Sequence, residues 1–397
     1  MKEASFISAS KVVDTIEQAG FEAYIVGGAV RDILLNRAVH DIDIATSAHP
    51  PDIMNIFPKT FPTGIEHGTV LVRFEKQSFE ITTFRKETGY TDYRRPDRVN
   101  FVTSLEEDLA RRDFTMNAMA FTKDKELIDP FNGKNDLSLK IIRTVGDPSQ
   151  RFTEDGLRMM RAIRFSAQLN FQIETTTIDS IKKNAHLLNN ISVERLADEW
   201  KKIIEAVHMK KALLYVKETN LSRYLPILKS HEDVLDILIK QDSSFSCLEE
   251  YISFVHLSYP SVSVTDWIRE WKLSNRVKKA SKLLVEVYKQ YEKEKIEWIV
   301  YQIPDYLIQS FSNLVKRLGH TPIENFSLVK ESLSINSRSD LVINGTDLIR
   351  FYPNKRPGAW LQTLLSTVEK KVVLGELTND KMVIGEWLKE WEQNGIN

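Results

Sequence analysis

The sequence contains little cysteine, no long apolar run and almost no excess of charge. Of its 397 residues only Cys247 is a cysteine, which excludes an internal disulfide and fits a reducing cytoplasm. The absence of a long uncharged apolar run argues against a membrane span, and residues 1–5 lack the apolar character of a secretion segment. We therefore expect a cytoplasmic protein. The formal net charge of −1 means that any nucleic-acid surface must come from local segregation of Lys and Arg.

The sequence does contain enough hydrophobic material for more than one domain. Hydrophobic residues make up 42% and charged residues 27% of the chain, which is ordinary for a globular protein. Strand patterns occur up to about residue 147, and helical patterns dominate after it. The sequence therefore predicts an α+β fold, in which a head with a mixed β-sheet and helices precedes an all-helical remainder.

One acidic stretch, Asp41-Ile42-Asp43-Ile44, organises the head. In a strand, Asp41 and Asp43 would share one face while Ile42 and Ile44 enter the core. Two adjacent carboxylates repel each other, and a fold accepts this repulsion when a cation lies between them. Oxygen ligands shared with substrate phosphates suit Mg²⁺, so we interpret the pair as the metal site of nucleotidyl transfer. Taken alone, such a pair is more often solvated or caps a helix.

A glycine turn precedes the acidic pair. The segment 23–26 predicts a short apolar strand, Gly27 and Gly28 a close turn, and the following residues a helix whose amides could meet a phosphate. Arg31, one turn into this helix, could bind a triphosphate. A plain strand-to-helix turn with a surface arginine would give the same pattern. A further helix is predicted over 7–19.

A second pair of strands is predicted over 69–74 and 79–85, joined as a hairpin. Alternation places Phe79, Ile81 and Thr83 on one face and Glu80, Thr82 and Phe84 on the other. Glu80 is thus a candidate third carboxylate, able to accept a proton from an attacking hydroxyl, or simply an exposed strand residue. Residues 86–98 are polar, basic and aromatic and predict a loop that could close over substrate. Arg111 and Arg112 fit a phosphate or ribose contact, or a surface charge cluster.

The segment 152–165 is the most informative part of the helical remainder. Thr153 can cap a helix in which Asp155 and Arg158 are neighbours on one face and Arg161 and Arg164 continue the row. This row could be an intrahelical salt bridge or a base-recognition site. Cytosine and adenine both present an amino group beside a ring-nitrogen acceptor, which matches a carboxylate beside a guanidinium. Uracil and guanine would face the carboxylate with a carbonyl, and an unmatched buried polar group costs about 1–3 kcal/mol.

Taken in order, these motifs resemble those of the class II CCA-adding enzymes, tRNA nucleotidyltransferases of the polymerase-beta-like superfamily. The matching stretches span most of residues 23–204, and 343–349 with 356–358 resembles the short bacterial members. The matches are 25–32, Asp41-Ile-Asp43, Arg111-Arg112-Asp113, Glu154-Asp155-x-x-Arg158-x-x-Arg161 and Ser192-x-Glu194-Arg195.

The resemblance implies a monomer or homodimer with a nucleotidyltransferase head (1–147), a helical neck that recognises the nucleotide base (148–207), and a body (208–300) and tail (301–397) that bind tRNA. It implies that Asp41 and Asp43 hold Mg²⁺ and that Glu80 fills a third acidic position. The implied substrates are tRNA, CTP and ATP. The residues that match nucleotide-binding positions of the family are Gly28, Arg31, Arg112, Asp155, Arg158, Arg161 and Arg164.

Three alternatives to complete CCA addition follow from the same motifs. A poly(A) polymerase, or an enzyme that adds only CC or only A, would share the superfamily signature. The length of the 86–98 segment argues against the CC-only type, which tends to have a shortened loop. A non-catalytic tRNA-binding module could also keep the fold, although Asp41, Asp43 and the arginine row argue for catalysis. Small-molecule nucleotidyl transfer would leave the long helical part without a role.

Overall fold

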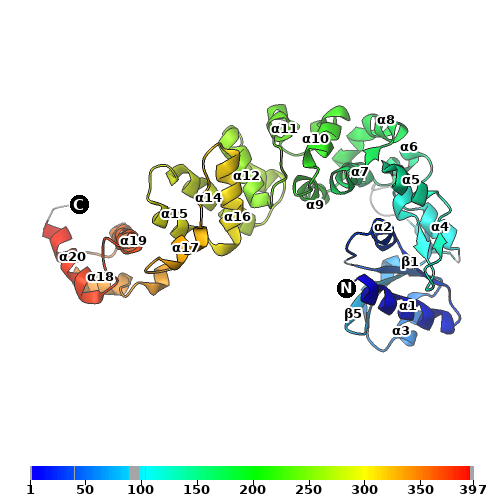
Figure 1. Ribbon diagram of the computed structural model, residues 1–397, viewed down its shortest axis with the longest axis horizontal. Coiled ribbons are helices and arrows are strands. Elements are labelled where there is room, and N and C mark those ends of the chain that lie inside the picture. Colours follow the sequence, from blue (N-terminus) through cyan, green and yellow to red (C-terminus); the bar gives the residue numbers. More distant parts are fainter. Residues whose placement is uncertain (1, 40, 89–97, 103, 394–397) are drawn as a thin grey trace. The chain divides into compact units, whose positions relative to one another are not determined.

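The structure is a computed structural model that describes residues 2–39, 41–88, 98–102 and 104–393 (Figure 1). The chain divides into two compact units, one formed by Met1–Ser244 with Glu270–Lys272 and the other by Phe245–Arg269 with Leu273–Asn397. The first unit carries the mixed sheet and several helices, and the second is helical. This arrangement confirms the predicted α+β class. Among the described helices, none has the length and apolar character needed to cross a membrane.

A seven-stranded sheet forms the centre of the head, in the order β3-β4-β5-β2-β1-β8-β9. Its β2 and β5 pair in parallel, whereas the other described neighbours pair antiparallel. The predicted strands 23–26 and 69–74 coincide with two of the observed ones. The bounds are β1 Ala23–Val26, β2 Asp43–Thr46, β3 Thr60–Gly64, β4 Thr69–Phe74, β5 Gln77–Thr83, β8 Ala120–Phe121 and β9 Leu127–Ile128.

The register of β2 against β5 places Asp43 directly opposite Glu80. Residues that face each other across two strands have side chains on the same side of the sheet, so the two carboxylates share one face. The alternation predicted for the acidic stretch is observed, because Ile42 and Ile44 are buried while Asp41 and Asp43 are exposed. The strand itself begins at Asp43, so Asp41 lies just before it and not within it as predicted.

The same face of the sheet becomes core beyond these carboxylates. Phe84, predicted to share the polar face with Glu80, is fully buried just after the end of β5. It packs with Ala45 of β2 and with Leu105 and Leu109 of α4 (Leu105–Ala110), which covers this part of the sheet. One sheet face thus carries acids at one end and an apolar core at the other.

Part of the segment predicted as a loop over 86–98 is strand. β6 (Arg85–Thr88) and β7 (Arg98–Phe101) form a separate two-stranded antiparallel sheet, because residues 85–88 pair in register with 98–101. Residues 89–97 lie outside the described residues. The remaining head helices are α1 Lys2–Gln18, where a helix over 7–19 was expected, α2 Gly28–Leu34, α3 Pro50–Ile56 and α5 Gly133–Leu139.

Helices continue the first unit after the sheet. The short strands β10 (Ile141–Ile142) and β11 (Gln172–Ile173) pair in parallel beside α7. The apolar stripe of α9 buries Leu196, Trp200 and Ile203, whereas Val207 is 79% exposed because the helix ends at Ile204. The helices are α6 Pro148–Glu154, α7 Leu157–Leu169, α8 Thr175–Asn184, α9 Val193–Ile204, α10 Met209–Glu218 and α11 Glu232–Ile239.

The second unit packs its helices around buried aromatic side chains and a buried ion pair. Trp267 lies edge-on against Tyr251, and Arg317 donates to the fully buried Glu250 at 2.8 Å. The helices are α12 Leu248–Ser258, α13 Val264–Glu270, α14 Asn275–Gln290, α15 Ile296–Gln302, α16 Ile308–Arg317, α17 Phe326–Glu331, α18 Gly345–Phe351, α19 Ala359–Val373 and α20 Lys381–Gln393.

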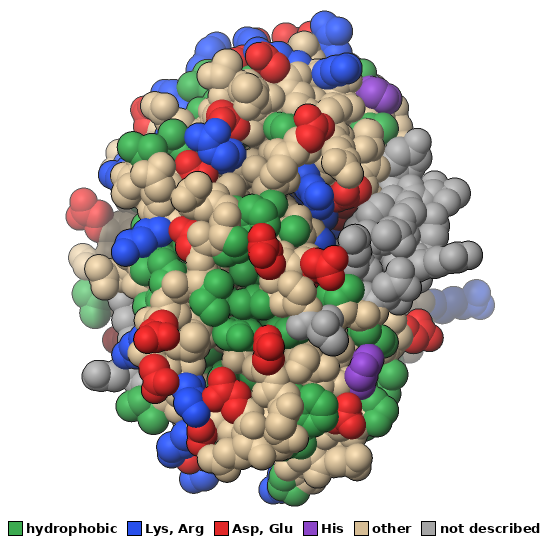
Figure 2. Space-filling view, turned by 90° about the vertical axis from the view of Figure 1, so that its right-hand side faces the viewer, with side chains coloured by type: hydrophobic (Ala, Val, Ile, Leu, Met, Phe, Trp, Pro, Cys, Tyr) green, Lys and Arg blue, Asp and Glu red, His purple; other side chains and the backbone are tan. Residues whose placement is uncertain are grey.

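Basic and acidic side chains are interspersed over the surface shown in Figure 2, around a central patch of hydrophobic side chains. This face carries no broad area of positive charge, in keeping with the net charge of −1. A site for a polyanion must therefore be a local gathering of cations.

Candidate active site

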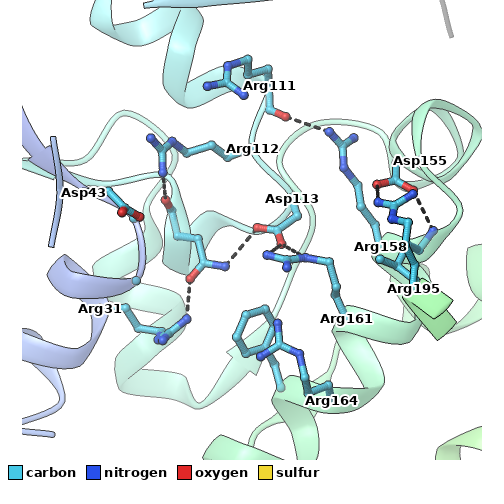
Figure 3. A pocket seen from close by; sticks show the side chains of 15 residues that line it. Arg31, Asp43, Arg111, Arg112, Asp113, Asp155, Arg158, Arg161, Arg164 and Arg195 are labelled. Carbon is cyan, nitrogen blue, oxygen red and sulfur yellow. Dashed lines mark hydrogen bonds and ion pairs between the residues drawn. The ribbon is translucent and has the colours of Figure 1, made fainter. Parts of the chain in front are cut away.

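A polar cavity of about 450 Å³ lies in the first unit, between the head sheet and the helices α7 and α9 (Figure 3). Seven arginines are among its described lining residues, with three aspartates, so the cavity is a local gathering of positive charge. Its size falls within the usual range for small-molecule sites. The lining consists of Gly27, Gly28, Arg31, Asp43, Arg111, Arg112, Asp113, Asn117, Asp155, Leu157, Arg158, Arg161, Arg164, Phe165 and Arg195.

The turn between β1 and α2 forms one side of the cavity. Gly27 has φ 73°, a conformation that favours glycine, and a Cβ there would lie 2.7 Å from Nη1 of Arg112. The missing side chain therefore lets a guanidinium approach the backbone where α2 begins. Arg31, on the first turn of α2, donates to Oδ1 of Asn117 at 2.7 Å and pairs with Asp32 at 3.0 Å.

The acidic residues meet at the end of the cavity nearest the sheet. Asp43 keeps access to solvent, but the surrounding protein partly desolvates its carboxylate. This desolvation and the neighbouring Glu80 raise the pKa of Asp43, Asp41 adds to the increase, and Arg112 opposes it. Asp43 is thus close enough to both Glu80 and Asp41 for each of them to repel it, although only Asp43 is among the lining residues. A bound cation would offset the repulsion that raises this pKa. Carboxylate oxygens are ligands that suit a hard divalent ion. Among the described residues, no three acidic, His or Cys side chains already surround one ion position.

The helix predicted over 152–165 is broken at Asp155. α6 ends at Glu154, Asp155 is extended, and α7 begins at Leu157, whose backbone amide donates to Oδ1 of Asp155 at 3.0 Å. The predicted placement of Asp155 and Arg158 on one continuous helix face is therefore wrong. The residue order suggested a cap at Thr153, but the hydroxyl of Thr153 instead donates to the carbonyl of Gln150 within α6.

Asp155 and Arg158 bind other partners in this structure. Arg195 of α9 donates to Oδ2 of Asp155 at 2.6 Å, a contact drawn in Figure 3. Arg158 donates through Nη1 to Glu154 at 2.5 Å and through Nη2 to the carbonyl of Arg111 at 3.0 Å. Both side chains line the cavity, so they stay available to a ligand without forming the predicted ion pair with each other.

The remaining arginines of α7 are each held by a carboxylate. Arg161 donates through Nε to Asp113 at 2.7 Å, and Asp113 also accepts from Asn117 at 3.0 Å. Burial opposes ionisation of Asp113, but Arg161 and Asn117 lower its pKa from 3.8 to about 2, and Asp113 in turn raises the pKa of Arg161. This pair joins the segment that follows α4 to helix α7.

Arg164 lies deeper in α7. It donates through Nε to the buried Glu199 at 2.5 Å, and its guanidinium lies 4.1 Å from the centroid of the Phe165 ring. Burial lowers the pKa of Arg164, and Glu199 opposes this effect. Arg31 and Arg161 also lie over the Phe165 ring, at 5.1 and 5.6 Å.

Most of the residues singled out in the sequence meet in this one cavity. Of the ten residues expected at catalytic or nucleotide-binding positions, eight line it, and Asp41 and Glu80 lie beside Asp43. No role was predicted for Asn117 or Phe165, and Arg195 was expected only as part of a motif. Asn117 follows Asp113 by four residues, and this spacing was the one sequence feature that could have indicated their hydrogen bond. The eight lining residues are Gly28, Arg31, Asp43, Arg112, Asp155, Arg158, Arg161 and Arg164.

Comparison with known families bears directly on this site. A model of the poly A polymerase head domain matches residues 23–143, and a model of tRNA nucleotidyltransferase domain 2 matches residues 251–388. Three findings together define a nucleotidyltransferase: the acidic strand, the arginine-lined cavity and the match of residues 23–143 to the poly A polymerase head domain.

Full-length relatives narrow the class. The CCA-adding enzyme of Oceanobacillus iheyensis is 41% identical, over 96% of this chain and 97% of its own length. The CCA-adding enzyme of Bacillus cereus is 39% identical over 97% of this chain and 98% of its own length. The crystal structure of the Bacillus stearothermophilus CCA-adding enzyme in complex with CTP superimposes with a TM-score of 0.88 at 36% identity, covering 98% of each chain.

The chain therefore belongs to the family of CCA-adding enzymes and is a tRNA nucleotidyltransferase. This confirms the resemblance drawn from the motifs and does not favour the poly(A) polymerase alternative. Nucleotidyltransferases of this kind act with a divalent metal ion.

Proposed function

We propose that this enzyme adds C, C and A to the 3′ end of tRNA from CTP and ATP, without a nucleic-acid template and with release of pyrophosphate. One observation carries the proposal. Figure 3 shows Asp43 and Asp155 at opposite ends of one cavity, with arginines between them. A nucleotide has its phosphates at one end, where metal and cations are needed, and its base at the other, where selection is needed.

The acidic end would perform the chemistry. Asp41 and Asp43 would hold Mg²⁺, which when bound supplies charge stabilisation at the reacting phosphate and lowers the pKa of the tRNA 3′-hydroxyl. Glu80, opposite Asp43 in the parallel strand, would accept the hydroxyl proton or complete the metal site. Arg31 and Arg112 would bind the triphosphate, and Gly28 would let it approach the backbone.

The other end would choose the base. The Asp155 carboxylate can accept from the amino group of cytosine or adenine while the Arg158 guanidinium donates to the ring nitrogen or carbonyl. Arg195 and the amide of Leu157 already orient Asp155, and Glu154 and the carbonyl of Arg111 orient Arg158. Arg161 and Arg164 would complete the nucleotide site. A fixed pair of this kind selects by leaving uracil and guanine mismatched.

The helical remainder of the chain would bind the tRNA. We propose a catalytic head over 1–147, a base-selecting neck over 148–207, and a body over 208–300 and tail over 301–397 that bind tRNA mainly through phosphates and shape. The exposed cations of α14, including Arg276, Lys279 and Lys282, would contact RNA phosphates. The enzyme would work in the cytoplasm, where its single cysteine stays reduced, as a monomer or homodimer.

Incorporation into tRNA transcripts tests the proposal. Transcripts ending before CCA are incubated with each nucleotide separately and together, and the products are sequenced. Complete addition predicts CC from CTP alone and CCA from CTP with ATP. Poly(A) tails would indicate a poly(A) polymerase, products stopping at CC or needing a prior CC would indicate partial addition, and binding without incorporation would indicate a non-catalytic module.

A further inference from the structure

A buried carboxylate lies behind the phosphate end of the cavity. The side chain of Asp108, on α4, is only 1% exposed and is not among the cavity-lining residues. Its Oδ1 accepts from Arg111 at 2.7 Å and 3.0 Å, and its Oδ2 accepts from Arg112 at 3.2 Å. One carboxylate thus holds two consecutive arginines that do line the cavity.

The Arg112 guanidinium is held through both of its Nη atoms. Nη2 donates to Asp108, and Nη1 makes a long hydrogen bond of 3.5 Å to the carbonyl of Asn117 and packs where a Cβ of Gly27 would be. Its Nε is buried and has no hydrogen-bond partner among the described residues. Buried donors are normally satisfied, so Arg112 keeps unused hydrogen-bonding capacity beside the cavity that this residue lines.

The charges around Asp108 lead to the same conclusion. Two adjacent guanidiniums repel each other, and one carboxylate between them leaves a single net positive charge on this wall. Although burial disfavours its ionised form, Arg111 and Arg112 hold the pKa of Asp108 below its usual value. The carboxylate therefore stays charged and keeps both arginines in place before a nucleotide arrives.

We infer that Asp108 is a positioning residue for nucleotide binding, which presents Arg112 to the phosphates of both CTP and ATP without touching them. This inference rests on the proposed role of Arg112 as a nucleotide-binding residue. Because the phosphates are common to both substrates, loss of Asp108 weakens their binding equally and leaves base selection unchanged. An amide at this position would place an NH₂ donor against a guanidinium donor or leave one arginine without its acceptor.

The test compares Asp108→Asn with Asp136→Asn in the full-length enzyme. Asp136 is a matched control, because it is equally buried in the same unit and pairs with Arg143 and Thr115 outside the cavity. Both variants should lower the melting temperature. Only Asp108→Asn should raise the KM for CTP and for ATP, each by about tenfold, as expected for a lost charged hydrogen bond, with the KM for tRNA within about twofold of wild type.

A mutant cycle with Arg112→Ala separates positioning from general damage. If Asp108 acts through Arg112, the double variant has the nucleotide KM of Arg112→Ala alone; additive effects would overturn the inference. An unchanged nucleotide KM in Asp108→Asn would also overturn it, and Asp108→Glu, which keeps the charge but moves the oxygens, replaces a variant that fails to fold. If Arg112→Ala itself leaves the nucleotide KM unchanged, the proposed role of Arg112 has failed instead.

Discussion

The cavity lies between two walls that use charged residues in different ways. The head wall is the end of the sheet that carries Asp43, and the neck wall is helix α7, which carries Arg161 and Arg164. On the head wall, Asp43 and Glu80 face each other across two parallel strands, and their mutual repulsion is left for a cation to offset. On the neck wall, Arg161 and Arg164 each already have a carboxylate partner, Asp113 and Glu199. The acids of the head wall thus have an unmet requirement for positive charge, whereas these two arginines of the neck wall already have their partners. This difference supports the proposal that the head performs the chemistry and the neck selects the base.

Removing the acids of the head wall should have the largest effect on activity. In Asp41→Ala, Asp43→Ala, incorporation of both C and A should fall by at least about a thousandfold, because metal and positioning are lost together. Single-turnover incorporation into tRNA ending before CCA measures the effect. The melting temperature should hold or rise, because like charges are removed.

Two further measurements sharpen the assignment to metal binding. Chelation of divalent ions should abolish incorporation by the wild type, and added Mg²⁺ should restore it. Normal activity of the double variant would refute the role given to these acids, whereas equal loss for CTP and ATP would support it.

Removing Asp155 and Arg158, the proposed base-selecting pair, should change the choice of nucleotide. In Asp155→Ala, Arg158→Ala, incorporation of UTP and GTP relative to CTP and ATP should rise by about 10- to 100-fold, because the mismatch penalty of about 1–3 kcal/mol is lost. Competition between labelled nucleotides on one transcript measures the ratio. The matched control is Asp179→Ala, Lys182→Ala, which removes an exposed pair on α8 of the same neck. Unchanged selectivity in the Asp155 and Arg158 variant would refute selection by this pair.

The sequence predicted the parts of each wall that depend on local pattern. The strand 23–26, the glycine turn and the alternation around Asp43 follow from short-range periodicity, and all three are observed. The register of Asp43 against Glu80 could not be predicted, because it depends on a parallel pairing between strands far apart in the chain.

The same limit explains the errors in the neck. The partner of Asp155 is Arg195, forty residues away, and no spacing rule within one helix could have found it. The residues Glu154 and Asp155 suit a helix start, so their pattern concealed the break between α6 and α7. Asn117 joins Arg31 to Asp113 only because the turn after α4 brings it there.

The contact between the two walls gives the smallest predicted effect, and it depends on pH. The pKa of Asp113 is about 2 in the folded protein against an ordinary 3.8, so its charged form stabilises the fold above pH 4. That contribution, about 2 kcal/mol, is lost as the pH falls from about 4 towards 2. Denaturant unfolding of the wild type and of Asp113→Asn should therefore differ by a constant amount from pH 5 to 7, and the difference should shrink below pH 4. A difference that persists unchanged at pH 3 would mean that the ion pair with Arg161 does not hold head and neck together.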